Sequence, residues 1–387
     1  MLIKGVEGKI IKDSRGDQTI EVSIKTDAGK FSASAPNGKS KGKYEAKPYI
    51  KSITKDIEAL EKISDYFSEE YFEKFDDLMR LEDTVKGHIG ANTLFAFESA
   101  VLKAISKEQK KEIWELINPN QRKFPRFVGN SIGGGLHSET AKKPDFQEFL
   151  LIPDTGSPHE NFRVNLESKE KEKQILKAKD QKFSEKKNDE NAWVTSLNEK
   201  EVLEILSELG IPFGIDAAAS SFYKRKKYHY KNPQLDRTPE EQIMYMKNLL
   251  KNFSMLYVED PFDEEDFESF AKLLKEFPNT LIVGDDLTVT NYKRLEKAIE
   301  MKSINALIVK PNQNGSLIEV SRVVELAKSK GIKTVFSHRS GETKEDIITD
   351  LAFGFGADFL KCGITGKERE VKIRRLIEIE KGLKKKN

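Results

Sequence analysis

The chain has 387 residues, of which 66 are Lys or Arg and 64 are Asp or Glu, so its net charge is only +2. This near-balance excludes the strong positive field of a dedicated nucleic-acid binder. The hydrophobic fraction of 37% is enough for a large core, and the single cysteine excludes a disulfide framework or a cysteine-based zinc site. The sequence has no apolar run of the ~20 residues that a membrane helix needs and no signal-peptide pattern, so we expect a cytoplasmic protein with neither nucleic-acid nor membrane partners.

The N-terminal part begins with strand-like sequence and then becomes helical. Ile20, Val22 and Ile24 alternate with polar residues, which is the period-two pattern of a half-buried strand. Residues 49–106 show helical patterning. Residues 91–102 contain Glu98 as their only charge, so we expect a buried helix there.

A polar segment with Pro119 and Pro125 separates this part from the rest of the chain. We therefore place an N-terminal α+β domain at residues 1–125 and a second domain at residues 126–387. Residues 169–191 form a dense run of mixed charges. Such a run is typical of a solvated helix or a mobile loop, and we expect that for most of it.

From residue 211 onward, one unit repeats: a short apolar strand, a loop and an amphipathic helix. The expected strands are 211–216, 255–259, 281–285, 306–310, 334–338 and 358–361. The expected helices are 239–253, 265–276, 290–301, 317–330, 344–353 and 367–382. This alternation predicts a parallel sheet, and so many units in succession favour a closed α/β barrel over a doubly wound sheet.

Each of these strands ends at a residue that can do chemistry. The six end residues are Asp216, Glu259, Asp285, Lys310, His338 and Lys361. The carboxyl ends of barrel strands converge on one mouth, where active sites are found. A single polar strand end is uninformative because water often begins there, but an unbroken series predicts one functional site.

The three carboxylates of this series predict a metal site. Buried carboxylates at such density repel one another unless a cation intervenes. Hard oxygen donors favour magnesium or manganese over zinc. Repulsion between Lys310 and Lys361, the metal and burial should lower the pKa of one lysine, as a general base requires. A carbon acid alpha to a carboxylate is a fitting target, because the metal stabilises the charge that forms.

Ser337–Gly341 adds a compact anion site at the end of one strand. The guanidinium of Arg339 can grip a phosphate through two parallel hydrogen bonds, and the Ser340 hydroxyl can donate another.

At these residues the sequence resembles the enolases, the glycolytic phosphopyruvate hydratases, and the resemblance runs over nearly the whole chain. Three segments match the family's motifs almost letter for letter: Val258–Pro261, Val283–Asn291 and Ser337–Thr343. Asp13–Gly16 resembles the family's opening motif and Gln147–Phe149 its barrel-entry motif. Lys310 stands before Asn312 and Gln313, and Lys361 before Gly363, as in the family.

The resemblance implies an α/β fold, with an enolase-type TIM-like barrel whose first strands are irregular and an N-terminal α+β domain that caps it. It also implies a magnesium-dependent lyase that dehydrates 2-phosphoglycerate to phosphoenolpyruvate. Two magnesium ions would serve each active site, the second arriving with the substrate. A homodimer or a higher homo-oligomer is expected from the family.

The resemblance also implies a role for each site residue. Lys310 would remove the C2 proton, and Glu190, aided by Glu148, would protonate the leaving C3 hydroxyl. Asp216, Glu259 and Asp285 would bind the first magnesium, Ser40 would bind the second, and Gln147 would support the metal site. Arg339 and Ser340 would bind the phosphate, Lys361 would bind the substrate carboxylate, and His137 and His338 would line the pocket.

Three segments depart from the family pattern. Asn188–Ala192 replaces a Gly-Asp-Glu-Gly-Gly loop, Asn37–Gly42 adds two lysines to the first lid loop, and a glycine cluster precedes His137. Loss of loop glycines removes permissive backbone conformations and could move Glu190. Alternatives to an enolase are therefore a paralogue acting on another phosphorylated or dianionic acid, and a catalytically silent binding protein with the same fold.

Overall fold

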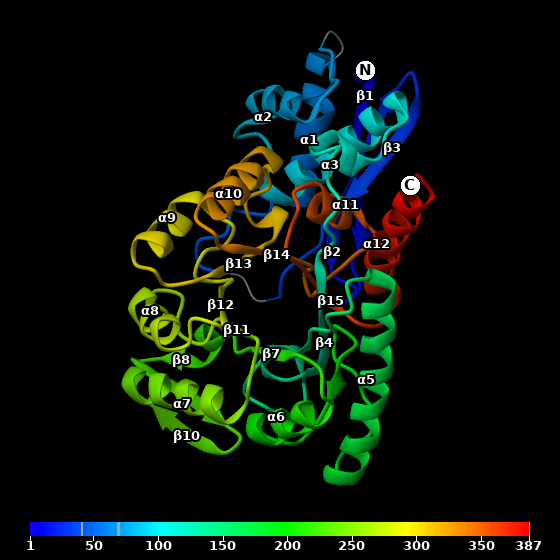
Figure 1. Ribbon diagram of the computed structural model, residues 1–387. Coiled ribbons are helices and arrows are strands. Elements are labelled where there is room, and N and C mark those ends of the chain that lie inside the picture. Colours follow the sequence, from blue (N-terminus) through cyan, green and yellow to red (C-terminus); the bar gives the residue numbers. More distant parts are fainter. Residues whose placement is uncertain (40–41, 68–69, 387) are drawn as a thin grey trace.

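The computed structural model describes residues 1–39, 42–67 and 70–386, and it consists of a small N-terminal unit resting on a barrel (Figure 1). The N-terminal unit holds the antiparallel strands β1 (Gly5–Lys12), β2 (Gln18–Thr26) and β3 (Gly29–Ser34). Its helices are α1 (Ile53–Ile63), α2 (Leu78–Val85), α3 (Ala91–Gln109) and α4 (Ile113–Ile117). The predicted alternation is confirmed, because Ile20, Val22 and Ile24 are all buried.

Helix α3 is the buried helix that the sequence predicts. It packs against β2 and β3, and even Glu98, the one charged residue in 91–102, is buried. The Glu98 carboxylate accepts the backbone N–H of Leu317 at 2.7 Å, which joins the N-terminal unit to the first turn of a barrel helix. The absence of β-branched runs and the many alanines allow close packing on all sides of α3.

Within the described residues, eight strands close into a barrel. They are β4 (Arg126–Gly133), β5 (Glu148–Leu151), β7 (Phe213–Asp216), β11 (Tyr257–Glu259), β12 (Leu281–Gly284), β13 (Ala306–Val309), β14 (Lys333–Ser337) and β15 (Phe359–Gly363). Pairing of β15 with β4 completes the ring. Strand β5 runs antiparallel to both of its neighbours, which is the irregular start that the resemblance implies.

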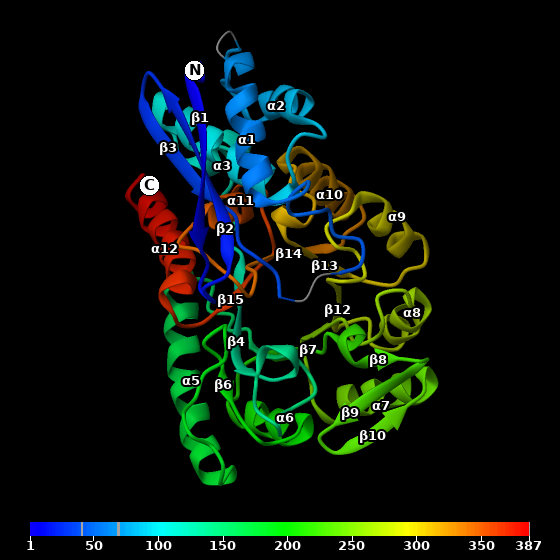
Figure 2. The same ribbon diagram turned by 180° about the vertical axis from the view of Figure 1, so that it is seen from behind.

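Helices cover the outside of the barrel. They are α5 (Pro158–Lys179), α6 (Glu199–Glu208), α7 (Pro239–Asn252), α8 (Phe267–Glu276), α9 (Tyr292–Glu300), α10 (Leu317–Ser329), α11 (Ile347–Gly354) and α12 (Lys367–Lys386). The short strand β6 (Trp193–Val194) adds to β4. Strands β8 (Tyr223–Lys224), β9 (Lys227–Lys231) and β10 (Gln234–Arg237) form a separate sheet, which accounts for the long first step of the repeat. Seen from behind, α5 continues the line of α12 along one edge of the molecule (Figure 2).

Side chains fill the centre of the barrel. Val128, Leu150, Tyr257, Val283 and Ile308 are among the buried residues of one interior cluster. Because these side chains fill the barrel interior, the space for a reaction lies at the carboxyl ends of the strands.

The N-terminal unit docks at those ends. Asn37 and Gly341 exchange backbone hydrogen bonds at 2.7 and 2.8 Å, and the Ser14 N–H donates to the Glu342 carbonyl oxygen at 2.7 Å. The loops after β1 and β3 therefore lie directly over the barrel mouth.

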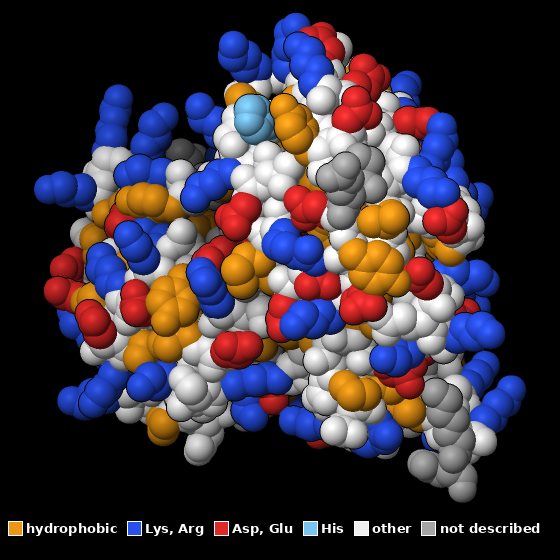
Figure 3. All heavy atoms as spheres, turned by 90° about the horizontal axis from the view of Figure 1, so that it is seen from above, with side chains coloured by type: hydrophobic (Ala, Val, Ile, Leu, Met, Phe, Trp, Pro, Cys, Tyr) orange, Lys and Arg blue, Asp and Glu red, His pale blue; other side chains and the backbone are white. Residues whose placement is uncertain are grey.

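The surface seen from above the N-terminal unit carries interspersed positive and negative side chains (Figure 3). Over the described part of the chain, every helix is too short or too polar to cross a bilayer. The mixed-charge run behaves only in part as predicted. Most of its helical part is solvated, but Lys169 and Glu172 on α5 are buried, and for these two residues the prediction of a solvated run is wrong.

Candidate active site

Strand register places one row of carboxylates across neighbouring strands of the barrel. Asp216 at the end of β7 is the Cα partner of both Glu148 on β5 and Glu259 on β11. The row is buried, with Asp216 and Glu148 each 3% exposed and Glu259 0%. Lys361 on β15 reaches into this row from the far side of the mouth.

The Lys361 ammonium lies among all three carboxylates. Its Nζ is 2.9 Å from Asp216 Oδ2, 2.8 Å from Glu259 Oε1 and 3.2 Å from Glu148 Oε2. Burial alone would lower the pKa of Lys361, but the surrounding carboxylates raise it well above its ordinary value. Lys361 is therefore a fixed cation of the site.

Lys310, at the end of β13, contacts the carboxylate of Asp285. Burial opposes the charge of this lysine, yet Asp285 raises its pKa. The same pair lowers the pKa of Asp285, although burial acts in the opposite direction. The prediction of one lysine with a lowered pKa is thus wrong for the protein groups taken alone, because each lysine is paired with carboxylates.

The predicted metal ligands surround these two ammonium groups. Burial and the charges of Asp216 and Asp285 raise the pKa of Glu259 well above its ordinary value, as the crowding of carboxyl groups in a buried site does. Among the described residues, Gln147 Oε1 is buried beside the cluster without a hydrogen-bond partner. A set of buried carboxylate and amide oxygens fits a hard divalent cation.

Two further aspartates, which the sequence reasoning missed, lie beside the predicted metal ligands. Carboxylate oxygens of Asp260, Asp285 and Asp286 lie within 4.8 Å of one another. Asp260 accepts the backbone N–H groups of Asp285 at 3.0 Å and Asp286 at 2.7 Å. Both aspartates directly follow predicted ligands in the matching motifs, and that adjacency was the available signal.

A second group of side chains gathers around Glu190. Ligand-type atoms of His137, Glu148 and Glu190 lie within 4.8 Å of one another. His137 Nδ1 is 3.3 Å from Glu190 Oε1, His338 Nε2 is 3.6 Å from Glu190 Oε2, and Asn130 Nδ2 donates to Glu190 Oε2 at 2.8 Å. Asn130 is a further site residue that sequence reasoning missed.

The electrostatics separate the two glutamates of this group. Burial alone would raise the pKa of Glu190, but the charged ring of His137 lowers it well below its ordinary value, whereas burial lowers the pKa of His338 and leaves that ring neutral. Burial raises the pKa of Glu148 to about 8. Burial alone would lower the pKa of His137, but Glu190 raises it to about 10. At neutral pH the group therefore holds a carboxylate at Glu190 and a proton at Glu148.

The anion site is built from both domains. The Ser340 hydroxyl oxygen accepts the Lys39 backbone N–H at 2.9 Å and the Arg15 Nη1–H at 2.8 Å. Arg339 Nη2 lies 3.0 Å from both carboxylate oxygens of Glu45. Arg15 and Glu45 are therefore site residues that the predictions left out, and the Arg339 fork already holds a carboxylate.

One small cavity joins nearly all of the predicted residues. It measures about 20 Å³, and the predicted residues lining it are His137, Gln147, Glu148, Glu190, Asp216, Lys310, His338, Arg339, Ser340 and Lys361. Glu259 and Asp285 reach the same cluster through the two lysines. Ser40 lies outside the described residues. Because side chains meet across so small a space, a substrate has to displace some of them on binding.

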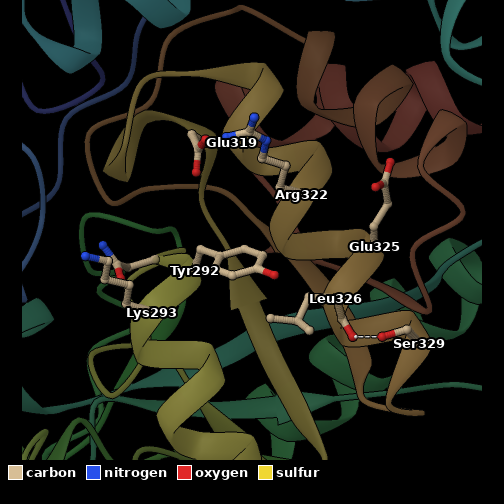
Figure 4. A pocket seen from close by; sticks show the side chains of 8 residues that line it. Tyr292, Lys293, Glu319, Arg322, Glu325, Leu326 and Ser329 are labelled. Carbon is tan, nitrogen blue, oxygen red and sulfur yellow. Dashed lines mark hydrogen bonds and ion pairs between the residues drawn. The ribbon is translucent and has the colours of Figure 1, made fainter.

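A wider pocket of about 760 Å³ lies elsewhere, between α9 and α10 on the outside of the barrel. Its side chains are spread along the two helices, with the Tyr292 ring facing α10 and Lys293 directed away from it (Figure 4). Arg322 pairs with Glu319 at the edge of this pocket, where both side chains are exposed. The carboxylates and lysines of the strand ends are remote from it, so the cavity at the mouth is the candidate active site.

Comparisons with known proteins cover the whole arrangement. The family model described as "Enolase, C-terminal TIM barrel domain" matches residues 122–387, and "Enolase, N-terminal domain" matches residues 3–117. A protein named enolase from Methanosphaera stadtmanae is 37% identical over 99% of this chain and 97% of its own length. Enolases from Methanocorpusculum labreanum (37%; 96% of this chain, 97% of the relative) and Pyrobaculum aerophilum (35%; 94% and 93%) are similarly related.

Proposed function

The chain belongs to the enolase family and is an enolase-type hydro-lyase, and we propose from this premise that it dehydrates 2-phosphoglycerate to phosphoenolpyruvate and water. The observation that supports the proposal is that Lys310, the proposed base, and Glu148, one of the proposed acid pair, stand on opposite sides of the ring. Between β13 with Lys310 and β5 with Glu148 lie β7, β11 and β12 on one side, and β14, β15 and β4 on the other. A base and an acid so placed can reach the C–H and C–OH of neighbouring carbons from opposite faces.

Magnesium is the proposed cofactor, and Asp216, Glu259 and Asp285 would hold the first ion. Gln147, with its unpaired amide oxygen, supports the same site. The cation would stabilise the charge that grows on the substrate carboxylate as the C2 proton leaves. A second ion, arriving with the substrate at Ser40, is proposed from the family resemblance alone.

Lys310 is the proposed base that takes the C2 proton. A lysine can act as a base only when its amine is neutral, whereas Asp285 now raises its pKa. A cation held by Asp285 and Glu259 would offset the two charges that raise the pKa of Lys310, and would leave burial, Arg339 and Lys361, which all lower it. The sequence-based expectation of a lysine with a lowered pKa therefore applies to the loaded site.

Glu148 and Glu190 are the proposed acid pair at C3. The raised pKa of Glu148 keeps a proton in the pair at neutral pH. Glu190 is ionised between His137 and His338, so a proton passed to it from Glu148 or His137 can go on to the leaving hydroxyl. The C3–O bond then breaks with the electron pair on oxygen, and water departs.

The anion-binding residues would orient the substrate. Arg339 and Ser340 would bind the phosphate. The Glu45 carboxylate, which lies at the Arg339 guanidinium, is also an anion and would have to give way to the phosphate. Lys361 would take the substrate carboxylate. The cytoplasmic location and the homo-oligomeric state are proposed from the family, and light scattering of the purified protein tests the latter.

Turnover is the direct test. Purified protein is mixed with 2-phosphoglycerate, and the enol double bond of the product is followed by ultraviolet absorbance with magnesium or with chelator. Magnesium-dependent turnover that Lys310→Ala abolishes is the expected result. A protein that binds magnesium without turnover would instead favour the paralogue acting on another phosphorylated acid, and a folded protein that binds no magnesium would favour a silent binding protein.

A further inference from the structure

Lys169 is a buried lysine in the middle of a helix that is otherwise rich in solvated charges. It is 3% exposed, and Glu172, three residues further along α5, is 0% exposed. An ammonium group is almost never fully buried unless its partners hold it there. The proposed reaction uses neither residue, so the contacts of the pair need another explanation.

The Lys169 side chain joins two loops of the active site. Its Nζ donates to the backbone carbonyl oxygen of Asn191 and to Thr365 Oγ1, the latter at 3.0 Å. Asn191 directly follows Glu190, and Thr365 lies in the loop that leaves β15 after Lys361. One buried side chain therefore ties the acid loop to the loop that follows β15.

The acid loop is shaped by side chains in place of the family's glycines. Asn191 takes the left-handed conformation with φ +63°, which asparagine tolerates better than most residues. The Asn188 Oδ1 accepts the N–H groups of Glu190 at 3.0 Å and Ala192 at 2.9 Å. The loop thus depends on these hydrogen bonds to keep its shape.

The helix is also linked to Glu190 indirectly, through strand β4. Glu172 Oε1 accepts the Ser131 hydroxyl at 2.8 Å, and Ser131 follows Asn130, which donates to Glu190 Oε2. Burial lowers the pKa of Lys169 to about 7 and raises the pKa of Glu172 to about 8. A neutral amine still donates to a carbonyl and a hydroxyl, so the tether persists whichever partner carries the proton.

We propose that Lys169 is a positioning residue for Glu190, which fixes the acid loop through the Asn191 carbonyl and Thr365. The proposal rests on the proposed function. It assigns Lys169 to the protonation of the leaving C3 hydroxyl and not to the removal of the C2 proton, because its contacts are to the acid loop and not to Lys310.

The test separates the two proton transfers. Lys169→Met keeps the length of the side chain and removes its hydrogen-bond donors. The matched control is Lys173→Met, because Lys173 lies one turn further along α5, is 19% exposed and pairs with Glu170. Dehydration is measured by ultraviolet absorbance, and C2 proton removal by exchange of the 2-phosphoglycerate C2 hydrogen in D₂O. Deuterium uptake by the amides of residues 188–192 reports on the loop itself.

In Lys169→Met we expect kcat for dehydration to fall about tenfold or more, with KM and C2 exchange within about twofold of the control and faster amide exchange in the loop. An equal fall of dehydration and C2 exchange, or unchanged dehydration, overturns the proposal. If Lys169→Met does not fold, Thr365→Val decides in the same assays, and an unchanged ratio of dehydration to exchange overturns it. If the wild-type protein turns over no 2-phosphoglycerate, the proposed function fails, and unaltered amide exchange in Lys169→Met would then overturn the tether separately.

Discussion

Removal of the Lys361 ammonium should destabilise the barrel strongly, and the effect should depend on pH and magnesium. At ~3 Å and an effective dielectric constant of ~20, the attraction between the Lys361 ammonium and one unit of negative charge in the carboxylate row amounts to about 5 kcal/mol. Desolvation of the ammonium and of its partners offsets most of this attraction. Breaking a buried pair while its partners remain costs about 3–5 kcal/mol, and we expect Lys361→Ala to lower the free energy of unfolding by that amount at pH 8.

The pH dependence follows from the carboxylates left behind. Lys361 lowers the pKa of Glu148, so its loss raises that pKa further above the ordinary value of 4.5. A carboxyl whose pKa is raised in the folded protein favours folding below its unfolded pKa and loses that contribution as pH rises. Glu148, with a pKa of about 8, stays protonated in the folded wild-type protein below that pH, so the deficit of Lys361→Ala should change little between pH 5 and pH 7 and grow as pH rises from 8 to 10. Magnesium should reduce the deficit.

Urea unfolding of wild-type protein and Lys361→Ala, with chelator or magnesium at pH 8 and pH 10, measures these effects. Lys333→Ala is the control, because Lys333 is 49% exposed and its pair with Asp358 is worth at most about 1 kcal/mol. A deficit in Lys361→Ala no larger than in the control, or equal at both pH values, would refute the reasoning.

Three further predictions follow from single contacts. His137, whose pKa Glu190 raises to about 10 against the opposing effect of burial, contributes stability that is complete below its unfolded pKa of 6.5 and is lost as pH rises through 10. In His137→Gln the melting temperature should therefore decline less steeply between pH 7 and 10 than in wild-type protein. The unfolding free energy that His137 contributes falls by on the order of 1.4 kcal/mol for each pH unit in this range, and the variant lacks this contribution. Tyr257→Phe removes the hydroxyl that donates to Glu259 Oε2 and should weaken magnesium binding about tenfold, measured by calorimetry. Gly363→Ala should lower kcat about tenfold or more in the turnover assay, because its Cβ would lie 2.6 Å from the Glu190 carbonyl oxygen.

Each of these predictions has a control and a contradicting result. A melting temperature in His137→Gln that falls as steeply with pH as in wild-type protein would contradict the first. Magnesium affinity in Tyr257→Phe equal to that of wild-type protein would remove the role given to the hydroxyl. Gly382→Ala, whose Cβ meets nothing within 4 Å, is the control for Gly363→Ala, and equal turnover in both would show that the acid loop has room to move.

The barrel could be predicted because its signals are local. Each strand is a short apolar run and each helix an amphipathic one. Strands β7, β11 and β13 have chemical groups at or just beyond their ends as the sequence indicates, whereas β15 runs two residues beyond Lys361. Closure was an inference from the number of units, and the pairing of β15 with β4 bears it out. The small sheet of β8–β10 was missed because it lies within one long step of the repeat.

Contacts between distant segments could not be predicted. Lys169 looks like any other charge in its run, and its burial depends on Asn191 and Thr365, which the fold alone brings to it. The Glu45 carboxylate on the Arg339 fork is of the same kind, since 294 residues separate the pair. The pKa of Lys310 was predicted with the wrong sign for the protein groups alone, because Asp285 was assigned to the metal without its pairing to the lysine.

Solvent exchange at C2 of 2-phosphoglycerate tests the central claim, that base and acid act from opposite sides of one barrel mouth. The exchange is measured in D₂O with magnesium for Lys310→Ala and for Glu190→Gln, beside dehydration of the same samples. The account predicts that Lys310→Ala loses both activities, whereas Glu190→Gln loses dehydration and keeps exchange. Exchange that survives in Lys310→Ala, or disappears in Glu190→Gln while the protein stays folded, would contradict it.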